Sequence, residues 1–347
     1  MNFKIIQSEH GISMDQTDHI LRMLELYFGP DYKNRRTDTP LRTDKQFELE
    51  ILQDNPANAL ELKALVKEYN GSYLSIYGAI SHITTTSRPD LCNAMSRLGV
   101  FQAAPSKLGF SSLHRIMKYL HTHPNVPLFY PNKPLTSTSL FETFTSNGDS
   151  KHRLAVPHCL CSHVDSSFAP QADRHSVSGH VETIGTVAID WKTEKQVTCA
   201  SSSSDSEVRS YYSGGKRTIK KRRFLQQIGL LLHQPTPLLT SLQTSHDKPT
   251  TVFEDNSGTS MMFNSGRVTS NLKHVDLPLQ YMHDIHERGI LQCVQCSTHV
   301  QWADTFTKQA PAPLHLNHRG WYMGRRFHPP VGTEHYKILT SSVPLSY

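Results

Sequence analysis

Residues 160–191 read LCSHVDSSFAPQADRHSVSGHVETIGTVAIDW, and this stretch decides the fold of the second half of the chain. Apolar and polar residues alternate over residues 160–168, which predicts a strand. Residues 179–184 and 186–191 predict two further strands, which form a hairpin that turns at Gly185. Three consecutive strands therefore open a domain built around a sheet.

The elements expected after these strands alternate between helix and strand. In order along the chain they are a basic helix over 205–232, a strand at 250–253, a helix near 273–288, a strand at 290–295 and a helix near 298–308. Gly214 and Gly215 interrupt the basic helix, and each costs about 1 kcal/mol relative to alanine, so a kink is expected there. Three strands followed by this alternation predict an α/β or α+β domain of about 150 residues.

The first half of the chain has a mainly helical pattern. We expect a strand at 3–6, an amphipathic helix over 18–28, a polar connection over 30–70 with one helix near 57–69, and helices over 71–123. Residues 131–157 are rich in Pro, Ser, Thr, Asn and Gly, which is typical of a linker. The expected organisation is a domain at 1–130, a linker at 131–157, a domain at 158–310 and a C-terminal tail at 311–347.

Composition excludes several classes of protein. The chain has 347 residues, with 36 Lys and Arg against 30 Asp and Glu, which gives a formal net charge of +6. No stretch approaches the ~18 consecutive apolar residues of a membrane span, and the N-terminus lacks the apolar run of a signal peptide. Six cysteines do not form a disulfide framework in a chain of this length, which favours a reducing compartment. We therefore expect a protein that is neither secreted nor membrane-spanning.

The basic helix carries six cations within the eight residues 216–223. A helix would gather them near one face, which is a footprint suited to nucleic-acid phosphates. A solvated helix face explains the same pattern equally well. The candidate phosphate-binding residues are Lys216, Arg217, Lys220 and Arg223.

Four acidic residues lie at the ends of predicted elements in the second domain, namely Asp165, Glu207, Asp255 and Asp304. Carboxylates from separate elements can converge on hard divalent cations such as Mg²⁺, which prefer oxygen ligands. Two such ions can activate a water and stabilise the leaving oxygen of a phosphodiester. Taken singly, each acid is also explained as a helix cap or a solvated terminus.

Two Cys/His groups resemble zinc-binding patterns. The first consists of Cys159, Cys161 and His163, and the second of Cys293, Cys296 and His299. Both groups fall on predicted strands, where residues three apart point to opposite faces, so Cys293 and Cys296 would diverge. Packing within the strands is therefore the better explanation.

A series of short motifs in the second domain follows the order found in one family. They are DSSFA at 165–169, DRHSVSG at 173–179, AIDWKTEKQ at 188–196, SSSDSE at 202–207, EDN at 254–256, LKHVD at 272–276 and ADTFTK at 303–308. Through them the domain resembles the ribonuclease H domain in the polymerase polyprotein of Ty1/copia-type LTR retrotransposons. In the first domain, YGAI at 77–80, TSRPDL at 86–91 and RIMKYL at 115–120 are similar to the stretch that follows the reverse-transcriptase palm in that family.

This resemblance implies a fold, an activity and a set of site residues. The fold is an α/β, ribonuclease H-like mixed five-stranded sheet flanked by helices, preceded by a mostly helical remnant of the reverse-transcriptase thumb and connection. The activity is hydrolysis of the RNA strand of RNA/DNA hybrids by two metal ions, Mg²⁺ or Mn²⁺, held by Asp165, Glu207, Asp255 and Asp304. His274 would shuttle protons or help to release the product, or be only a capping or surface histidine.

The resemblance also implies partners and a location, and it leaves two alternatives open. The partners are an RNA/DNA hybrid and the remainder of the polyprotein, in the cytoplasm within a virus-like particle or in the nucleus. No YxDD motif occurs, so we expect no DNA synthesis by this chain alone. A catalytically inactive nucleic-acid-binding relic and a decayed element copy are the alternatives. The four acids favour the nuclease, whereas the missing palm and the Gly214–Gly215 pair favour decay.

Overall fold

The computed structural model divides the chain into two compact units. Unit 1 comprises Met1–Lys133 and Gln309–Tyr347, and unit 2 comprises Pro134–Lys308. The structure describes residues 3–28, 36–131, 138–144, 150–157, 160–170, 174–185, 187–228, 249–266 and 275–324. Among these residues, no helix combines the length and the apolar character needed to cross a membrane.

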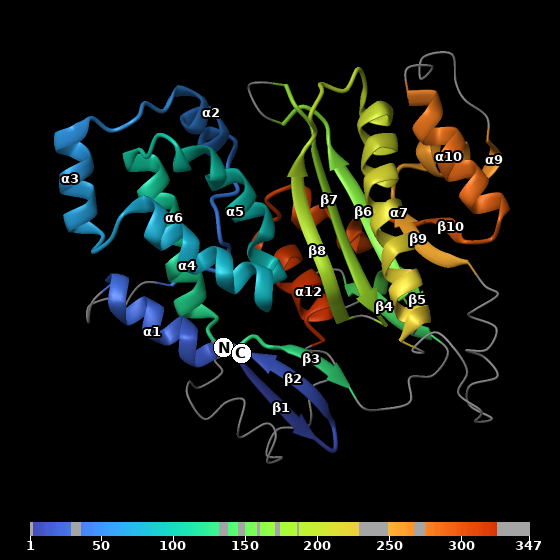
Figure 1. The fold of residues 1–347 in the computed structure, drawn as a ribbon, viewed down its shortest axis with the longest axis horizontal. Helices are drawn as coiled ribbons and strands as arrows, with labels where there is room; N and C mark the ends of the chain where they lie inside the picture. The colour runs from blue at the N-terminus through green and yellow to red at the C-terminus, as the bar shows by residue number, and fades with distance from the viewer. Residues whose placement is uncertain are drawn as a thin grey trace. The chain divides into compact units, whose positions relative to one another are not determined.

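Unit 1 is mainly helical, as expected, with one small antiparallel sheet (Figure 1). Its strands are β1 (Lys4–Ser8), β2 (Gly11–Asp15) and β3 (Leu128–Pro131), in the order β1-β2-β3. Its helices are α1 (Thr17–Phe28), α2 (Lys45–Gln53), α3 (Ala59–Glu68), α4 (Tyr73–Thr86), η2 (Pro89–Leu91), α5 (Cys92–Leu98), η3 (Gly99–Gln102), α6 (Lys107–Thr122) and α12 (Ala312–Tyr322). The last of these lies within the expected C-terminal tail.

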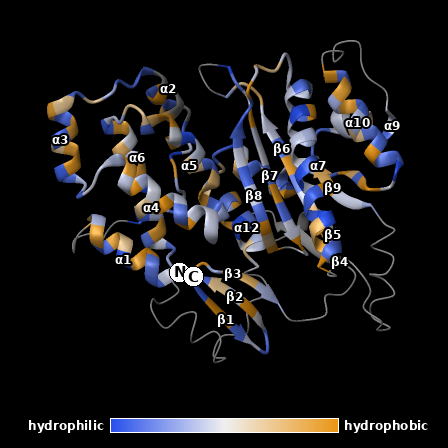
Figure 2. Ribbon diagram, in the orientation of Figure 1, coloured by the Kyte–Doolittle hydropathy of each residue, from blue (hydrophilic) through white to orange (hydrophobic). Residues whose placement is uncertain are grey.

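Capping side chains fix where these helices begin. Asn58 forms a capping box with Glu61 at the start of α3, and Ser72 and Ser106 accept hydrogen bonds from backbone N–H groups at the starts of α4 and α6. Figure 2 shows hydrophobic and hydrophilic residues on the same helices, for example α1 and α3. The apolar sides meet in a core that includes Ile80 and Ile116, both with no exposed surface.

A buried polar network connects η2, α6 and α12 within unit 1. The Arg88 guanidinium donates two hydrogen bonds to the Asp90 carboxylate, at 2.9 and 2.7 Å. Tyr119 Oη donates to Asp90 Oδ2 at 2.6 Å and accepts from Arg319 Nη1 at 2.7 Å. His315 Nε2 lies 3.0 Å from the same Tyr119 hydroxyl. The TSRPDL and RIMKYL motifs therefore supply a structural network, which α12 completes.

Unit 2 contains the mixed five-stranded sheet that was expected (Figure 1). Its elements are β4 (Thr138–Phe144), β5 (Ser150–Pro157), β6 (Leu160–Ser167), β7 (Val177–Ile184), β8 (Val187–Lys195), α7 (Ser203–Gln227), β9 (Thr250–Glu254), α9 (Ser257–Ser265), α10 (Asp276–Glu287), β10 (Leu291–Gln295), η5 (Thr298–Val300) and α11 (Asp304–Thr307). The strand order is β10-β9-β6-β7-β8. The pairs β6/β7 and β7/β8 are antiparallel, whereas β6/β9 and β9/β10 are parallel. The α/β class is thus confirmed.

Helix α7 is continuous, and the expected kink at Gly214 and Gly215 was wrong. A Cβ atom on Gly214 would lie 2.4 Å from Cγ1 of Val164 on β6, and one on Gly215 would lie 3.0 Å from Sδ of Met282 on α10. The glycines therefore let α7 approach the sheet and α10 closely. This packing offsets the free energy that the two glycines cost through their low helix propensity.

Two further segments differ from the sequence-based expectation. Residues 131–157, expected as a linker, contain β4 and β5, which pair antiparallel in a separate two-stranded sheet. The single helix expected near 298–308 is instead η5 and α11. Gln301 between them is extended, with φ −79° and ψ 100°.

Candidate metal centre

The parallel pairing of β6 with β9 brings two of the predicted acids to one edge of the sheet. The register places His163 opposite Phe253. Asp165 and Asp255 each follow two residues later, Asp165 near the carboxyl end of β6 and Asp255 directly after β9. Because neighbouring strands are about 4.8 Å apart, the two carboxylates start from adjacent backbone positions.

Asp304 reaches the same edge because α11 packs closely against β7. Gly179 on β7 pairs with Asp165 on β6, and a Cβ atom at Gly179 would lie 2.7 Å from Thr307 Cγ2 and 2.8 Å from Phe306 Cβ. The segment before α11 is anchored by Trp302, whose ring stacks on His163 at a centroid distance of 4.3 Å. Because residue 179 is a glycine, α11, which carries Asp304, can pack closely against β7.

The three aspartates form a compact cluster. Each offers one carboxylate oxygen, and these oxygens of Asp165, Asp255 and Asp304 all lie within 4.8 Å of one another. Among the described residues, this is the group of His, Cys, Asp and Glu side chains close enough to share one ion. Asp165 is 1% exposed and Asp304 6% exposed, so their oxygens are largely shielded from water, whereas Asp255 is half-buried.

Glu207 lies beside this triad but outside the 4.8 Å group. It projects from the second turn of α7, and Ser206 next to it donates a hydrogen bond to Ser166 Oγ at 2.6 Å. Alternation along β6 puts Ser166 on the face that α7 covers and Asp165 on the opposite face. Glu207 therefore approaches the aspartate cluster from the other side of the sheet edge, and its side chain is 7% exposed.

Burial and mutual repulsion raise the pKa values of the clustered carboxyls. The pKa of Asp165 lies well above its usual value because the group is buried and faces Asp304 and Glu207. Burial, then the charge of Asp255, raises the pKa of Glu207 to about 8. The pKa of Asp304 is also raised, mainly by burial. Such a cluster holds its full negative charge only when cations neutralise it.

Sequence reasoning missed three polar groups that contact the triad. Thr298 Oγ1 donates to Asp255 Oδ2 at 2.8 Å, and the Thr307 hydroxyl donates to Asp165 Oδ2. Lys308 Nζ lies 2.9 Å from Asp304 Oδ1 and 3.5 Å from Asp165. Thr307 and Lys308 belong to the ADTFTK motif, so the motif was a signal for them. Thr298 has no comparable signal.

Glu254 is a further carboxyl that sequence reasoning passed over. It is fully buried, and burial, then the charge of Glu207, places its pKa well above the usual range. Its Oε1 accepts a hydrogen bond from the Asn256 N–H at 3.1 Å, whereas Oε2 has no hydrogen-bond partner among the described residues. The signal in the sequence that could have identified Glu254 is an acidic residue within a buried strand.

The donor set fits a hard divalent cation. All the ligand candidates are carboxylate oxygens, which suit Mg²⁺ and Mn²⁺ and not the softer metals that thiolates select. The buried Oε2 atoms of Glu207 and Glu254 lack hydrogen-bond partners within the described part of the chain, which leaves acceptor capacity at the centre. Asp165, Asp255 and Asp304 are the residues that could hold the ion directly.

The candidate phosphate-binding residues do not share one environment. Lys216, Lys220 and Arg223 are exposed on α7, and Lys216 Nζ lies over the Tyr212 ring, 4.0 Å from its centroid. Arg217 instead forms an ion pair with Asp190 on β8 at 2.9 Å. The expectation of a single cationic face is therefore only partly met, since Arg222 in the same run is also buried.

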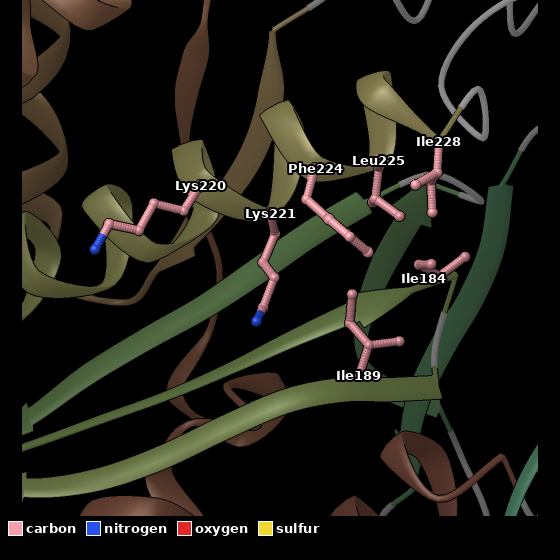
Figure 3. Close-up of a pocket in the computed structure, with 7 residues that line it drawn as sticks. All are labelled: Ile184, Ile189, Lys220, Lys221, Phe224, Leu225 and Ile228. Atoms are coloured by element: carbon pink, nitrogen blue, oxygen red, sulfur yellow. The ribbon is translucent and has the colours of Figure 1, made fainter.

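A cavity of about 530 Å³ lies at the C-terminal end of α7, away from the aspartate cluster. Its lining residues are Ile184, Ile189, Lys220, Lys221, Phe224, Leu225 and Ile228. Figure 3 shows the Lys220 ammonium pointing away from Ile184 and Ile189. Leu225 follows Glu207 by 18 helical residues, roughly 27 Å along the axis, so this cavity is not the site of the acids.

The zinc interpretation receives no support from the described Cys and His side chains. His163 is buried between the rings of Phe253 and Trp302, and Cys161 Sγ lies 3.0 Å from Thr183 Oγ1. Cys293 is buried on β10, whereas His299 on η5 is exposed. Cys159 and the predicted proton shuttle His274 lie outside the described residues.

Comparison with known proteins relates the chain to transposon polyproteins. It is 27% identical over 237 residues to the retrovirus-related Pol polyprotein from transposon RE1 of Arabidopsis thaliana, which is 68% of this chain and 14% of that protein. It is 22% identical over 315 residues to the corresponding polyprotein from transposon TNT 1-94 of Nicotiana tabacum, which is 90% of this chain and 20% of that protein. The chain thus covers only a small part of these relatives.

A shorter relative is the secreted RxLR effector protein 161 of Plasmopara viticola, which is 30% identical over 139 residues, 40% of this chain and 82% of that protein. No family model and no solved structure matches the chain. The similarity to the polyproteins extends over most of the chain and confirms the resemblance to a retrotransposon polyprotein. Over most of its length, the chain is thus similar to a part of retrovirus-related Pol polyproteins from transposons.

Proposed function

We propose that unit 2 is a ribonuclease H domain that hydrolyses the RNA strand of RNA/DNA hybrids with two divalent metal ions. The observation that carries this proposal is the convergence of Asp165, Asp255 and Asp304 within 4.8 Å at one edge of the β10-β9-β6-β7-β8 sheet. The motif order and the similarity to transposon Pol polyproteins support the same assignment.

The residues of this chain have distinct tasks in the proposed reaction. The three aspartates would hold Mg²⁺, or Mn²⁺ in its place, against the scissile phosphate, and Glu207 would complete the ligand set from α7. When bound, the ions lower the pKa of an attacking water and stabilise the leaving 3′ oxygen. Thr298 and Thr307 orient the carboxylates of Asp255 and Asp165. The products would carry 5′-phosphate and 3′-hydroxyl ends.

The hybrid would be bound mainly through its phosphates. The exposed cations Lys216, Lys220 and Arg223 on α7 are the candidates for these contacts. Phosphate contacts make binding dependent on salt and largely independent of sequence. Groove shape and contacts with the 2′-hydroxyl groups would distinguish the hybrid from DNA. In this proposal the chain acts as part of a larger polyprotein, in the cytoplasm within a virus-like particle or in the nucleus.

The test is a substrate panel incubated with the full chain in Mg²⁺ or in EDTA. The panel contains an RNA/DNA hybrid labelled on either strand, duplex RNA and duplex DNA, and Asp255→Asn serves as the blank. We expect cleavage of the RNA strand of the hybrid only, in Mg²⁺ only. Cleavage no faster than with Asp255→Asn would refute the nuclease.

An inactive nucleic-acid-binding relic is the second candidate, because Glu207 lies outside the 4.8 Å group. It predicts binding of the hybrid that weakens as salt is raised, without cleavage in Mg²⁺ or Mn²⁺.

A further inference from the structure

One cation of the chain already lies at the acid cluster. The Lys308 ammonium donates to Asp304 Oδ1 at 2.9 Å and lies 3.5 Å from the Asp165 carboxylate. Both partners belong to the group of three aspartates that could share an ion. Lys308 therefore contacts two of the three carboxylates that the proposed function assigns to the metal.

The short helix α11 sets the position of Lys308. Lys308 follows Asp304 by four residues, and its N–H donates to the Asp304 carbonyl at 2.8 Å at the end of α11. The same helix thus presents an acid and a base on one side. The Lys308 side chain is 44% exposed, so the ammonium can leave the cluster for solvent without unpacking the core.

A divalent ion and this ammonium compete for the same oxygens. The cluster carries carboxyl groups that repel one another, and Lys308 provides the positive charge that offsets part of this repulsion. Mg²⁺ binds carboxylate oxygens at about 2.0–2.1 Å. An ion held by Asp165 and Asp304 would therefore repel the nearby ammonium.

We propose that Lys308 is a displaceable internal cation, which holds Asp165 and Asp304 together in the metal-free protein and leaves them when a divalent ion binds. This inference rests on the proposed metal centre. It makes Lys308 a residue that sets the affinity for the first ion, because binding includes the cost of displacing the ammonium.

The test is calorimetric titration of the full chain with MnCl₂ in the absence of nucleic acid. Lys308→Met removes the competing charge, and Lys308→Arg keeps it. Lys195→Met, at an exposed position on β8, controls for the change in net charge. We expect Lys308→Met to bind Mn²⁺ more tightly than the wild type by on the order of tenfold, and the two other variants to bind as the wild type does.

A second readout is the unfolding temperature in EDTA and in Mn²⁺. Lys308→Met should unfold at a lower temperature than the wild type in EDTA, and Mn²⁺ should raise its unfolding temperature by more. Equal Mn²⁺ affinity in Lys308→Met and Lys195→Met would overturn the inference, as would absence of Mn²⁺ binding to the wild type. A chain that binds Mn²⁺ with the expected affinity change but cleaves no hybrid would refute the nuclease alone.

Discussion

At the scale of single residues, two glycines decide how closely the long helix approaches the sheet. Replacing Gly214 by alanine places a Cβ atom 2.4 Å from Val164 Cγ1, and the β-branched valine on a central strand has little room to move. Alanine gains about 1 kcal/mol of helix propensity, but overpacking of this kind costs about 1–3 kcal/mol. We expect Gly214→Ala to lower the free energy of unfolding of unit 2, measured by urea denaturation.

Gly215→Ala is the matched control for this prediction. Its new Cβ atom would meet the flexible end of Met282, at 3.0 Å from Sδ and 3.1 Å from Cε. Because the methionine can adjust, the gain in propensity should offset the contact. A Gly214→Ala protein as stable as Gly215→Ala would contradict the packing that we assign to this helix.

The buried carboxyl group of Glu182 should make the free energy of unfolding of unit 2 depend on pH. Its side chain is fully buried on β7, neither carboxyl oxygen has a hydrogen-bond partner among the described residues, and burial, then the charge of Asp190, raises its pKa to about 8. Between about pH 4.5 and 8 the unfolded chain releases this proton while the folded chain keeps it. The free energy of unfolding therefore falls as pH rises, by at most about 1.4 kcal/mol per pH unit from this group.

Replacing Glu182 by glutamine removes the titrating carboxyl group and keeps the shape of the side chain. We expect Glu182→Gln to be more stable than the wild type at pH 8 and to lose part of the decline between pH 5 and 8, as followed by urea denaturation at each pH. Glu194→Gln on β8 is the control, because the pKa of Glu194 is lowered and its replacement should change stability in the opposite sense. The prediction would be contradicted if the free energy of unfolding of the wild type and of Glu182→Gln changed with pH in the same way.

At the scale of elements, helix α12 is an integral part of unit 1 through the Arg88–Asp90–Tyr119–Arg319 network. Asp90→Asn would leave the buried Arg88 guanidinium without its carboxylate and weaken the link through Tyr119 to Arg319, and breaking a buried pair in this way costs about 3–5 kcal/mol. We expect faster amide hydrogen exchange throughout α4, α6 and α12, measured peptide by peptide, with unit 2 unchanged.

Asp44→Asn provides the matched comparison for Asp90→Asn. Asp44 pairs with Arg42 on the surface, where solvent screens the pair so that it contributes little to stability, and asparagine caps α2 as well as aspartate does. Exchange in α12 that is equally slow in Asp90→Asn and in the wild type would show that the network does not hold this helix.

The sequence predicted some elements well because their local patterns are strong. The strand β6 and the turn at Gly185, where φ is 60°, were both predicted, although β6 is buried on both faces, whereas its alternating pattern indicates burial on one. Helix α9 was missed because its sequence SGTSMMFNS has few strong helix formers, and Asn256 starts it by accepting a hydrogen bond from the Thr259 N–H. The break between η5 and α11 depends on Gln301 and on stacking of Trp302 on His163, which are long-range contacts.

At the scale of the whole molecule, the candidate site could be predicted only through motif order. Asp165 and Asp255 lie 90 residues apart, and only the parallel register of β6 and β9 makes them neighbours. The residues that hold the acids in place escaped prediction because they act through contacts across the sheet edge. Thr298 has no signal in its local sequence, and the motifs that contain Gly179 and Lys308 do not show which side chains these residues face.

If the aspartate cluster is the metal centre of a nuclease, cleavage of the hybrid must depend on Mg²⁺, and the initial rate of cleavage as a function of Mg²⁺ concentration tests this most directly. The wild-type chain should cleave the RNA strand at a rate that rises with Mg²⁺ and saturates. Asp304→Asn should reduce that rate by about 100-fold or more, whereas Asp284→Asn, on the exposed surface of α10, should retain it. Cleavage that is independent of Mg²⁺, or that survives in Asp304→Asn, would contradict the account.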